Sequence, residues 1–314
     1  MTGAGRSPRV VSARSFAVTV RDPSMDALMQ FILSGFTVGA VYALVALGFT
    51  IIYNASDVVN FAQGEFVMLG GMITAFTYAA GLPLPLAGLL AIVITAAVGV
   101  ALNKLAIEPA RGAPVVSLVI ITIGASIFIR GVAQLVFDKQ LHRFPAFSGD
   151  DPIHILGATI LPQSLWVIGG AVFVFVGLWA FFTKTLTGKA VLAAANNRLA
   201  AQLVGINTNW VMTLSFSLSA AIAALAGVLI TPITLVSYDV GVALALKGFA
   251  AAMLGGMGNP KGALVGGIAL GLMEALTAGY LSSQYKEAVA FVVILAVLFA
   301  MPQGLFGAKS TERV

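Results

Sequence analysis

Long apolar stretches recur along this chain, separated only by short polar breaks, and they constrain its fold more than any other feature. A helix needs about 20 apolar residues to cross roughly 30 Å of hydrocarbon. Charged residues make up 9% of the chain, against roughly 25% in soluble domains, which is too few to coat a water-exposed core. The sequence therefore predicts an all-α, polytopic transmembrane helical bundle with about eight to nine membrane helices.

Nine apolar runs mark the expected helices. Near the C-terminus two runs are separated by a glycine-rich turn that contains Asn259 and Pro260, so we expect two helices meeting at a tight turn. We expect residues 25–307 to form a single transmembrane domain and residues 308–314 a cytoplasmic tail. The nine runs cover residues 28–53, 61–80, 84–105, 115–137, 165–182, 211–230, 242–257, 263–281 and 288–301.

Residue composition excludes several functional classes. Cysteine is absent and only two histidines are present, which excludes a disulfide scaffold or thiolate site and disfavours a histidine-rich metal centre. The net charge of +5 comes from Lys and Arg in short loops, where they orient a chain in the bilayer rather than bind nucleic acid. No G-x-x-x-x-G-K-[ST] phosphate loop occurs. We therefore expect no cofactor, no metal and no enzymatic activity in this chain.

The loops rich in Lys and Arg predict the orientation of the bundle. They are expected in the cytoplasm, with the 138–162 loop and the turns at 237–241 and 282–286 on the opposite side. The cytoplasmic set is Lys104, Arg111, Lys184, Lys189, Arg198, Lys261, Lys309 and Arg313.

The first 24 residues do not fit this orientation. Three spans before the Lys104 loop place the N-terminus outside, yet residues 1–24 carry four Arg, which normally hold a terminus inside. We expect residues 1–24 to be a disordered extension, or not part of a natural chain that starts at Met25. The alternative is a cytoplasmic arm followed by an additional or re-entrant segment near residues 54–65.

Four polar residues follow the first apolar run. Residues 54–66 contain Asp57, Asn60, Gln63 and Glu65, and polar side chains at membrane depth usually face the bundle interior or water. One interpretation is a solvated cytoplasmic turn in which Asp57 caps the following helix. The other is a helix start that lines a transport path, with Asn60, Gln63 and Glu65 as the candidate path residues.

Three ionisable residues fall inside or near the expected spans. Arg130 lies close to the outer end of its span, where its long stem can snorkel to the surface. Lys247 and Glu274 lie in the outer halves of neighbouring spans and form a candidate intramembrane ion pair. That pair has either a structural role or a role in gating and solute passage.

Glycines recur on two of the expected helices. Small residues let helix backbones approach closely where lipid supplies no hydrophobic driving force, so we expect tight helix packing there. The two sets are Gly64, Gly70 and Gly71, and Gly266, Gly267 and Gly271.

The loop at residues 183–209 predicts a short helix outside the membrane. Its interior, residues 188–204, is rich in Ala and Leu and contains no Pro. Isolated helices below about 12 to 15 residues are marginal in water, so this helix is expected to dock on another surface. Lipid headgroups are one such surface, and a partner protein is the preferred one.

Several motifs together resemble a known family. They are the opening segment 25–53, NFAQGEF with the following MLGG, the turn GGMGNPKGALVGG and the terminal MPQGLFG. With the 183–209 loop they resemble the LivH-type permease subunits of ABC importers for branched-chain amino acids, over nearly the whole chain after Met25. The resemblance implies an ABC importer permease fold.

In such permeases the loop after the fifth apolar run is the coupling helix that sits in a cleft of an ATPase subunit. Leu192 stands where the family commonly has Arg, and the family commonly has an acidic residue near Asn197, so the resemblance does not imply a salt bridge to the ATPase at these positions. The positions of this sequence that match the pattern are Gly188, Ala190, Ala193, Asn196, Ala200, Gly205 and Ile206.

The resemblance also implies partners and a mechanism. The partners are a second, LivM-type permease, two ATPase subunits and a periplasmic amino-acid-binding protein, assembled in the lipid of the bacterial inner membrane. ATP hydrolysis on the partners would drive alternating access for leucine, isoleucine or valine. Two alternatives remain open, namely an ion-coupled secondary transporter of small polar solutes and an ABC permease for urea or short amides.

Overall fold

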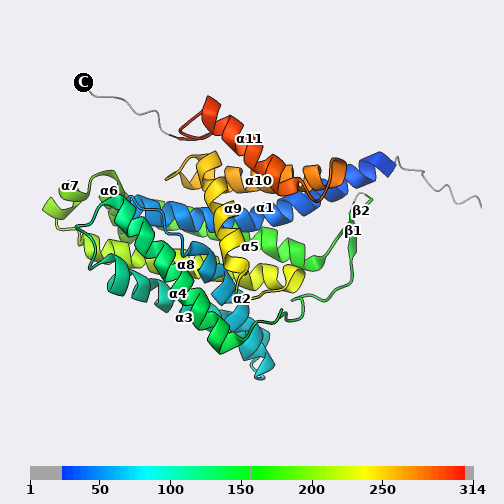
Figure 1. Ribbon diagram of the computed structural model, residues 1–314, viewed down its shortest axis with the longest axis horizontal. Helices are drawn as coiled ribbons and strands as arrows, with labels where there is room; N and C mark the ends of the chain where they lie inside the picture. Colours follow the sequence, from blue (N-terminus) through cyan, green and yellow to red (C-terminus); the bar gives the residue numbers. More distant parts are fainter. Residues whose placement is uncertain (1–22, 156, 308–314) are drawn as a thin grey trace, which may run out of the picture.

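The computed structural model describes residues 23–155 and 157–307, and the expectations for residues 1–22 and 308–314 lie outside the described residues. Each of the nine apolar runs is helical in it (Figure 1), which confirms the predicted all-α polytopic bundle. The elements are α1 (Pro23–Ser56), α2 (Gln63–Ala79), α3 (Leu84–Leu102) continued by the π-helical turn η1 (Asn103–Ile107), α4 (Val115–Phe137), β1 (Ile153–Ile155), β2 (Ala158–Ile160), α5 (Pro162–Lys184), α6 (Leu186–Asn196), α7 (Arg198–Leu203), α8 (Thr208–Thr234), α9 (Val240–Gly255), α10 (Pro260–Tyr280) and α11 (Lys286–Ala300).

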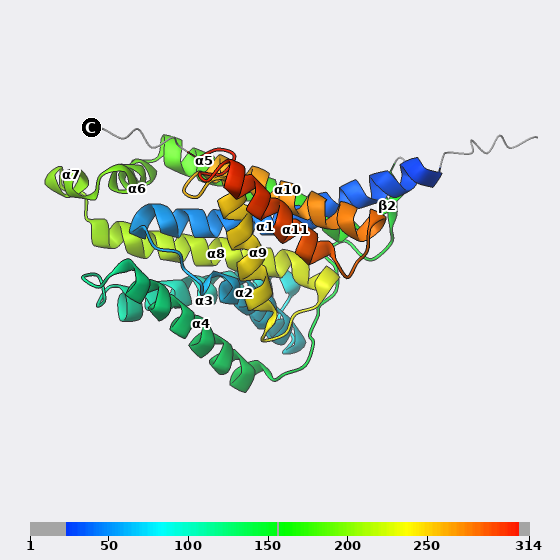
Figure 2. The same ribbon diagram turned by 45° about the horizontal axis from the view of Figure 1, so that its top comes forward.

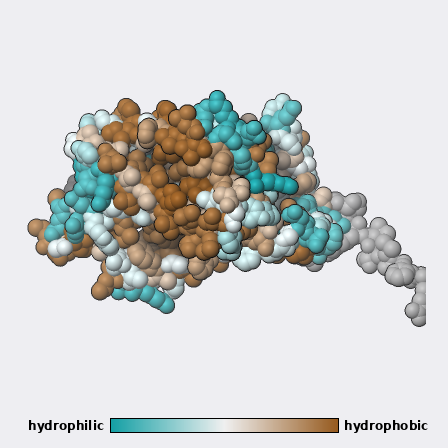
Figure 3. Space-filling model, turned by 90° about the horizontal axis from the view of Figure 1, so that it is seen from below, coloured by the Kyte–Doolittle hydropathy of each residue, from teal (hydrophilic) through white to brown (hydrophobic). Residues whose placement is uncertain are grey.

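Six helical segments among the described residues are long and apolar enough to cross a membrane. They are α1, α3 with η1, α4, α5, α8 and α10. The other three apolar helices, α2, α9 and α11, have 17, 16 and 15 residues. At 1.5 Å per residue these reach only about 22 to 26 Å, less than the hydrocarbon thickness. Figure 3 shows one face of the molecule with a broad apolar centre and hydrophilic residues gathered mainly toward its left and right ends.

The basic loops lie together at one end of the bundle. Figures 1 and 2 place α6 and α7 at the left end and the β1–β2 hairpin at the opposite end. The Arg111 guanidinium donates a hydrogen bond to Asn209, which joins the α3–α4 loop to the start of α8 beside α7. Asn54, near the end of α1, donates to the Gly258 carbonyl in the α9–α10 turn at 2.8 Å. The positive-inside rule predicts that this end faces the cytoplasm; we call it the inner end and the other the outer end.

Glycines bring helix backbones into direct contact, which confirms the close packing expected for both glycine sets. A Cβ atom at Gly271 of α10 would lie 2.3 Å from the Gly39 Cα of α1, and one at Gly70 of α2 would lie 2.3 Å from the Ala224 carbonyl oxygen of α8. No side chain larger than hydrogen fits such a gap. The α1–α10 and α2–α8 crossings form the centre of the bundle.

The chain after α11 closes the inner end of α9. The Leu305 and Phe306 amides donate to the carbonyls of Leu254 and Gly255, each at 2.9 Å, and so satisfy carbonyl groups that a helix C-terminus leaves free. Asn259 adds a side-chain hydrogen bond from Nδ2 to the Phe306 carbonyl at 3.0 Å, while its Oδ1 accepts from the Lys261 amide at 3.0 Å and caps α10. The MPQGLFG motif therefore has a structural role, which is to hold the α9–α10 turn.

Replacing Asn259 by alanine is expected to lower the free energy of unfolding by about 1 to 3 kcal/mol, because it removes a helix cap and the bond to Phe306. Asn259→Asp keeps the capping oxygen and loses only the Nδ2 donor, so it should lose less. Thermal unfolding of the detergent-solubilised protein compares the two variants. Equal melting temperatures for Asn259→Ala and wild type would contradict the role of this residue in holding the turn.

The outer end carries a small hairpin that the sequence did not predict. β1 and β2 pair antiparallel with His154 opposite Thr159, and Gln30 of α1 bonds both backbone groups of Thr159, accepting from its amide at 2.7 Å and donating to its carbonyl at 2.9 Å. α1 has 34 residues, or about 51 Å, against roughly 30 Å of hydrocarbon. The hairpin therefore braces the part of α1 that extends beyond the membrane.

Candidate functional site

The connection between α1 and α2 turns back into the bundle. α1 ends at Ser56, and the backbone is not helical again until Gln63. Asn60, Gln63 and Glu65 are 1%, 0% and 1% exposed, so the solvated-turn interpretation is wrong for these three residues. Asp57 is exposed and does not cap α2, whose N-cap residue is Ala62 without a side-chain bond. Non-helical backbone at membrane depth is tolerated only where protein surrounds it or where it lines a cavity.

The side chain of Gln63 points into the centre of the bundle. Its Oε1 lies 2.8 Å from the Ser219 hydroxyl of α8, which also lies 2.8 Å from the Gly48 carbonyl of α1. A Cβ atom at Gly48 would lie within 2.9 Å of both Gln63 and Ser219, so this glycine makes room for the contact. Gln63 thus joins α1, α2 and α8, with both its amide oxygen and its amide nitrogen near Ser219.

Glu65 faces a different neighbour, α4. The Ser126 hydroxyl donates to Glu65 Oε1 at 2.8 Å, and one turn earlier the Phe61 amide donates to Thr122 Oγ1 at 3.2 Å. Arg130, one turn beyond Ser126, is close enough to Glu65 for their charges to interact. Thr122, Ser126 and Arg130 recur every four residues and therefore share one face of α4.

Glu65, Thr122, Ser126 and Arg130 lie where α2 meets α4, and all but the partly exposed Arg130 are buried. With the buried Asn60, which precedes Phe61 in the chain, we call these residues the polar seam. The sequence prediction singled out Asn60 and Glu65 and missed the α4 residues. The sequence does contain a signal for these α4 residues, because Thr122, Ser126 and Arg130 are polar residues spaced four apart inside an apolar run. Arg130 was expected to snorkel toward the surface, and in the structure it is partly exposed, with its charge near enough to Glu65 to interact.

Two side-chain atoms in the polar seam have no hydrogen-bond partner among the described residues. They are Glu65 Oε2 and Asn60 Nδ2, and both atoms are buried. Gly241, in the first turn of α9, leaves the space beside the carboxylate, since a Cβ atom there would lie 2.6 Å from Glu65 Oε2. Buried polar atoms normally form hydrogen bonds, and an unpartnered one inside a membrane bundle marks a candidate ligand or solute contact.

The structure also brings Lys247 and Glu274 together. Lys247 Nζ lies 3.2 Å from Glu274 Oε1 and 3.1 Å from Glu287 Oε1, and the Tyr42 hydroxyl donates to Glu274 Oε2 at 2.7 Å. The Lys247 and Glu274 side chains are 13% and 7% exposed, whereas Glu287 is 58% exposed. This network joins α1, α9, α10 and α11, and each of its charged groups has a partner of opposite charge.

Replacing Lys247 by methionine is expected to lower the free energy of unfolding by about 3 to 5 kcal/mol, because Glu274 is left buried without a counter-charge. The double variant Lys247→Met with Glu274→Gln is expected to recover most of that loss, since glutamine still accepts the Tyr42 hydrogen bond. Lys261→Met, at an exposed position, serves as the control. Thermal unfolding in detergent measures all three, and a double variant as unstable as Lys247→Met would contradict this role.

At the inner end, the segment predicted to form one helix over residues 188–204 forms two helices, α6 and α7. Asn197 has an extended backbone (φ −153°), and its side chain accepts from the Ala200 amide at 2.9 Å, so it ends α6 and caps α7. Thr185 caps α6 in the same way through the Gly188 amide at 2.9 Å. A single rod over residues 188–204 is therefore wrong, because an asparagine side chain in that position competes with the helical backbone.

The coupling-helix candidates lie on this α6–α7 pair. Gly188 is buried where α6 meets the end of α5, since a Cβ atom there would lie 2.1 Å from the Phe181 carbonyl oxygen. Ala190 and Ile206 are half-buried, and Ala193, Asn196, Ala200 and Gly205 are exposed. Large apolar side chains are exposed around them, namely Leu186 (86%), Leu199 (74%), Leu203 (89%) and Val204 (76%). Clustered exposed apolar side chains typically mark a docking surface.

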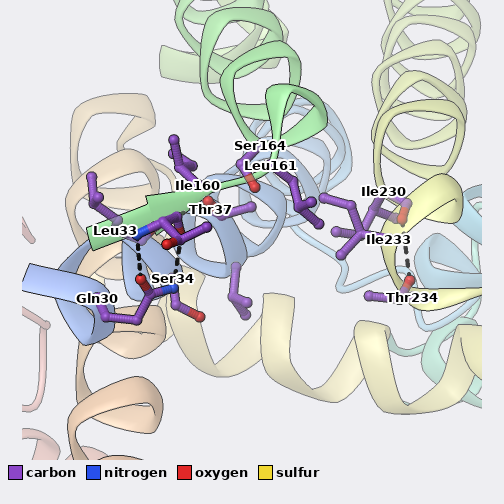
Figure 4. A pocket seen from close by; sticks show the side chains of 12 residues that line it. Gln30, Leu33, Ser34, Thr37, Ile160, Leu161, Ser164, Ile230, Ile233 and Thr234 are labelled. Carbon is purple, nitrogen blue, oxygen red and sulfur yellow. Dashed lines mark hydrogen bonds between the residues drawn. The ribbon is translucent and has the colours of Figure 1, made fainter. Parts of the chain in front are cut away.

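A cavity of about 190 Å³ lies at the outer end between α1, β2, α5 and α8. Figure 4 shows its wall of Leu33, Ile160 and Ile230 with the hydroxyl groups of Thr37 and Ser164. Among the described residues, no charged side chain lines it. A solute that carries full charges would lose its hydration there without a counter-charge, so this cavity does not suit an ionic ligand.

Comparison with known proteins identifies the family. Residues 31–298 match the family described as branched-chain amino acid transport system / permease component. The chain is 33% identical to the high-affinity branched-chain amino acid transport system permease protein LivH of Escherichia coli (strain K12), over 91% of this chain and 97% of that protein. It is 33% identical to the permease protein BraD of Pseudomonas aeruginosa, over 93% of this chain and 100% of that protein.

A more distant relative is the ribose import permease protein RbsC of Haemophilus influenzae, which is 27% identical over 82% of this chain and 81% of that protein. The matched region contains the polar seam, the α6–α7 pair and the Lys247 network. With a family match over most of its length and relatives at 33% identity over nearly all of it, this multi-pass membrane chain belongs to the family of permease components of branched-chain amino acid transport systems.

Proposed function

We propose that this chain is the permease subunit of an ATP-driven ABC importer in the bacterial inner membrane. It would translocate leucine, isoleucine or valine delivered by a periplasmic binding protein, with residues 25–307 acting as one permease domain. The observation that carries the proposal is the 33% identity, over 91% of this chain, to a protein named as a branched-chain amino acid permease.

The energy for transport would come from partner ATPase subunits that dock on the α6–α7 pair. Two features support this assignment. The pair lies at the inner end (Figure 1), and it exposes Leu199, Leu203 and Val204, which a protein partner would cover. The exposed candidates Ala193, Asn196, Ala200 and Gly205 would lie in that contact, whereas Gly188 would set the angle between α5 and α6.

The translocation path would run past the polar seam, between this permease and a second one of LivM type. Within the predicted set, Asn60 and Glu65 would face the solute, because each has an unpartnered buried atom. Gln63 would act indirectly, by holding the start of α2 against Ser219. The Lys247 and Glu274 pair would hold α9 against α10 at the side of this path.

Reconstitution tests the proposal. The chain would be co-expressed with the second permease and both ATPase subunits, and the complex placed in proteoliposomes with ATP on the inner side and binding protein on the outer side. The expected result is accumulation of labelled leucine, isoleucine or valine that requires both ATP and the binding protein. Accumulation of urea or acetamide instead would overturn the substrate assignment. Uptake driven by an ion gradient without ATP would overturn the importer class.

A further inference from the structure

We propose that Glu65 and Arg130 recognise the two opposite charges of a zwitterionic solute, Glu65 contacting its ammonium group and Arg130 its carboxylate. This inference rests on the proposed function and deepens it, because it names the chemistry by which the polar seam would accept free amino acids. Asn60 Nδ2 is a further donor for the solute within the same seam.

Glu65 is placed to accept a hydrogen bond from a cation. Its Oε1 is held by Ser126 at 2.8 Å, whereas its Oε2 is buried and has no hydrogen-bond partner among the described residues. Asp239, ahead of α9, adds a second negative charge close enough to interact with Glu65. A carboxylate without a cation in contact is costly at membrane depth, and an ammonium group from the solute would supply the missing donor and a positive charge in direct contact.

Arg130 is placed to contact the other end of the solute. It lies one helical turn from Ser126, its charge interacts with that of Glu65, and it is only partly buried. Across the described part of the chain, Arg130 forms no ion pair within 4.0 Å and no hydrogen bond, so its guanidinium is available to a carboxylate. Guanidinium and carboxylate groups match in geometry and form strong bidentate hydrogen bonds.

The other candidate solute sites in the described structure lack an available carboxylate together with an available guanidinium group. The outer-end cavity between α1 and α5 has hydroxyl groups but no charged side chain. The Lys247 network has charges, but Lys247 already contacts two carboxylates. Urea and short amides carry no full charge, so they would bring neither Glu65 nor Arg130 a counter-charge in direct contact. A free amino acid satisfies both groups at once.

Access to the polar seam requires α4 to move. α4 covers Glu65 with Ser126, yet only 17% of its apolar stretch is buried, the smallest share among the six spans, and Figure 2 shows it at the margin of the bundle. Segments with few buried contacts open at the lowest free-energy cost. A displacement of α4 would expose the unpartnered carboxylate oxygen while leaving the α1–α10 and α2–α8 crossings intact.

The test uses the assembled importer in proteoliposomes with labelled leucine. Glu65→Gln keeps the side-chain shape and the bond from Ser126 but removes the charge. Arg130→Gln removes the positive charge and leaves a shorter polar side chain. Each is expected to lower uptake about 10- to 100-fold, the range for losing a hydrogen bond to a charged group. Glu65→Asp and Arg130→Lys keep the charge and are expected to recover part of the uptake. ATP hydrolysis stimulated by loaded binding protein should persist in all four variants.

A purely structural ion pair makes the opposite prediction for the double variant Glu65→Gln with Arg130→Gln. Removing both charges would restore uptake if they served only to neutralise each other, whereas our proposal expects uptake at or below that of either single variant. Melting temperatures supply a second readout, because removal of a buried unpartnered charge is expected to leave stability unchanged or higher. Thr95→Val, which removes another buried unpartnered hydroxyl outside the seam, is the control and is expected to transport normally.

The experiment distinguishes failure of the proposed function from failure of the charge-recognition inference. If the wild-type complex accumulates none of leucine, isoleucine and valine, the proposed function itself is wrong. If wild type transports leucine and both single variants match it, the function stands and the charge-recognition inference is overturned. Recovery of uptake in the double variant, or a loss of uptake matched by a large fall in melting temperature, would also overturn it.

Discussion

Replacing Gly271 by valine is expected to prevent assembly of the bundle. Even the first atom of the new side chain would lie 2.3 Å from both the Cα and the amide nitrogen of Gly39 and 2.6 Å from the Gly35 carbonyl oxygen. All three are backbone atoms of α1, so no change of rotamer relieves the clash, and the two helices must separate. Overpacking of this kind costs about 3 kcal/mol or more. Yield of monodisperse protein after detergent extraction, followed by thermal unfolding, measures the effect.

Gly124→Ala on α4 is the matched control. A Cβ atom at Gly124 has nothing within 4 Å, so the added methyl group is free of clashes, and alanine is the better helix former. Its yield and melting temperature are expected to equal or exceed those of wild type. Normal assembly of Gly271→Val would show that the α1–α10 crossing is looser than described. A lower yield and a lower melting temperature in both variants would point to a general intolerance of substitutions at glycine.

Replacing Ala200 by phenylalanine is expected to reduce ATP-driven uptake by at least tenfold while leaving the permease inserted and folded. Ala200 is exposed on α7, and its backbone amide, not its side chain, forms the capping bond with Asn197. The larger ring therefore alters the docking surface and not the fold. If an ATPase docks on the pair as proposed, a mismatch of about 1.4 kcal/mol in that contact already corresponds to a factor of ten in binding. Leucine uptake and ATP hydrolysis in the assembled importer would be measured together.

Ala80→Phe tests the specificity of that effect. Ala80 is an exposed alanine at the end of α2, at the outer end, and its substitution is expected to change neither uptake nor ATP hydrolysis. Equal uptake in Ala200→Phe and wild type would remove α7 from the coupling contact. A loss of folded protein in Ala200→Phe would show instead that the ring disturbs the permease itself.

The locations of the helices could be predicted because hydrophobic length is a local property of the sequence. Each of the nine apolar runs became a helix, and the glycines predicted to pack closely do so. The helix break at Asn197 is also predictable from the sequence, because an asparagine is a common helix N-cap residue and here it caps α7 through the Ala200 amide. The high alanine content of this loop favours one continuous helix, and the Asn197 cap interrupts it.

The grouping of polar residues was harder to predict because it depends on which helices become neighbours. Gln63 and Glu65 are two residues apart on α2, so they point to nearly opposite sides, and one reaches Ser219 while the other reaches Ser126. Sequence proximity suggested a single site. The contact with α4 joins residues 61 positions apart, and no spacing within the chain specifies it.

The α1–α10 crossing has a mechanical consequence. Where Gly267 and Gly271 rest on the backbone of α1, no intervening side chain can slide or reorient, so the two helices form a single stiff strut. Asn54 of α1 donates to the Gly258 carbonyl just ahead of α10 at 2.8 Å, and farther along the Tyr42 hydroxyl of α1 donates to Glu274 of α10 at 2.7 Å, so side-chain bonds also hold the two helices together. A displacement of the inner end would therefore move α1 and α10 together, toward the outer half of the bundle as well.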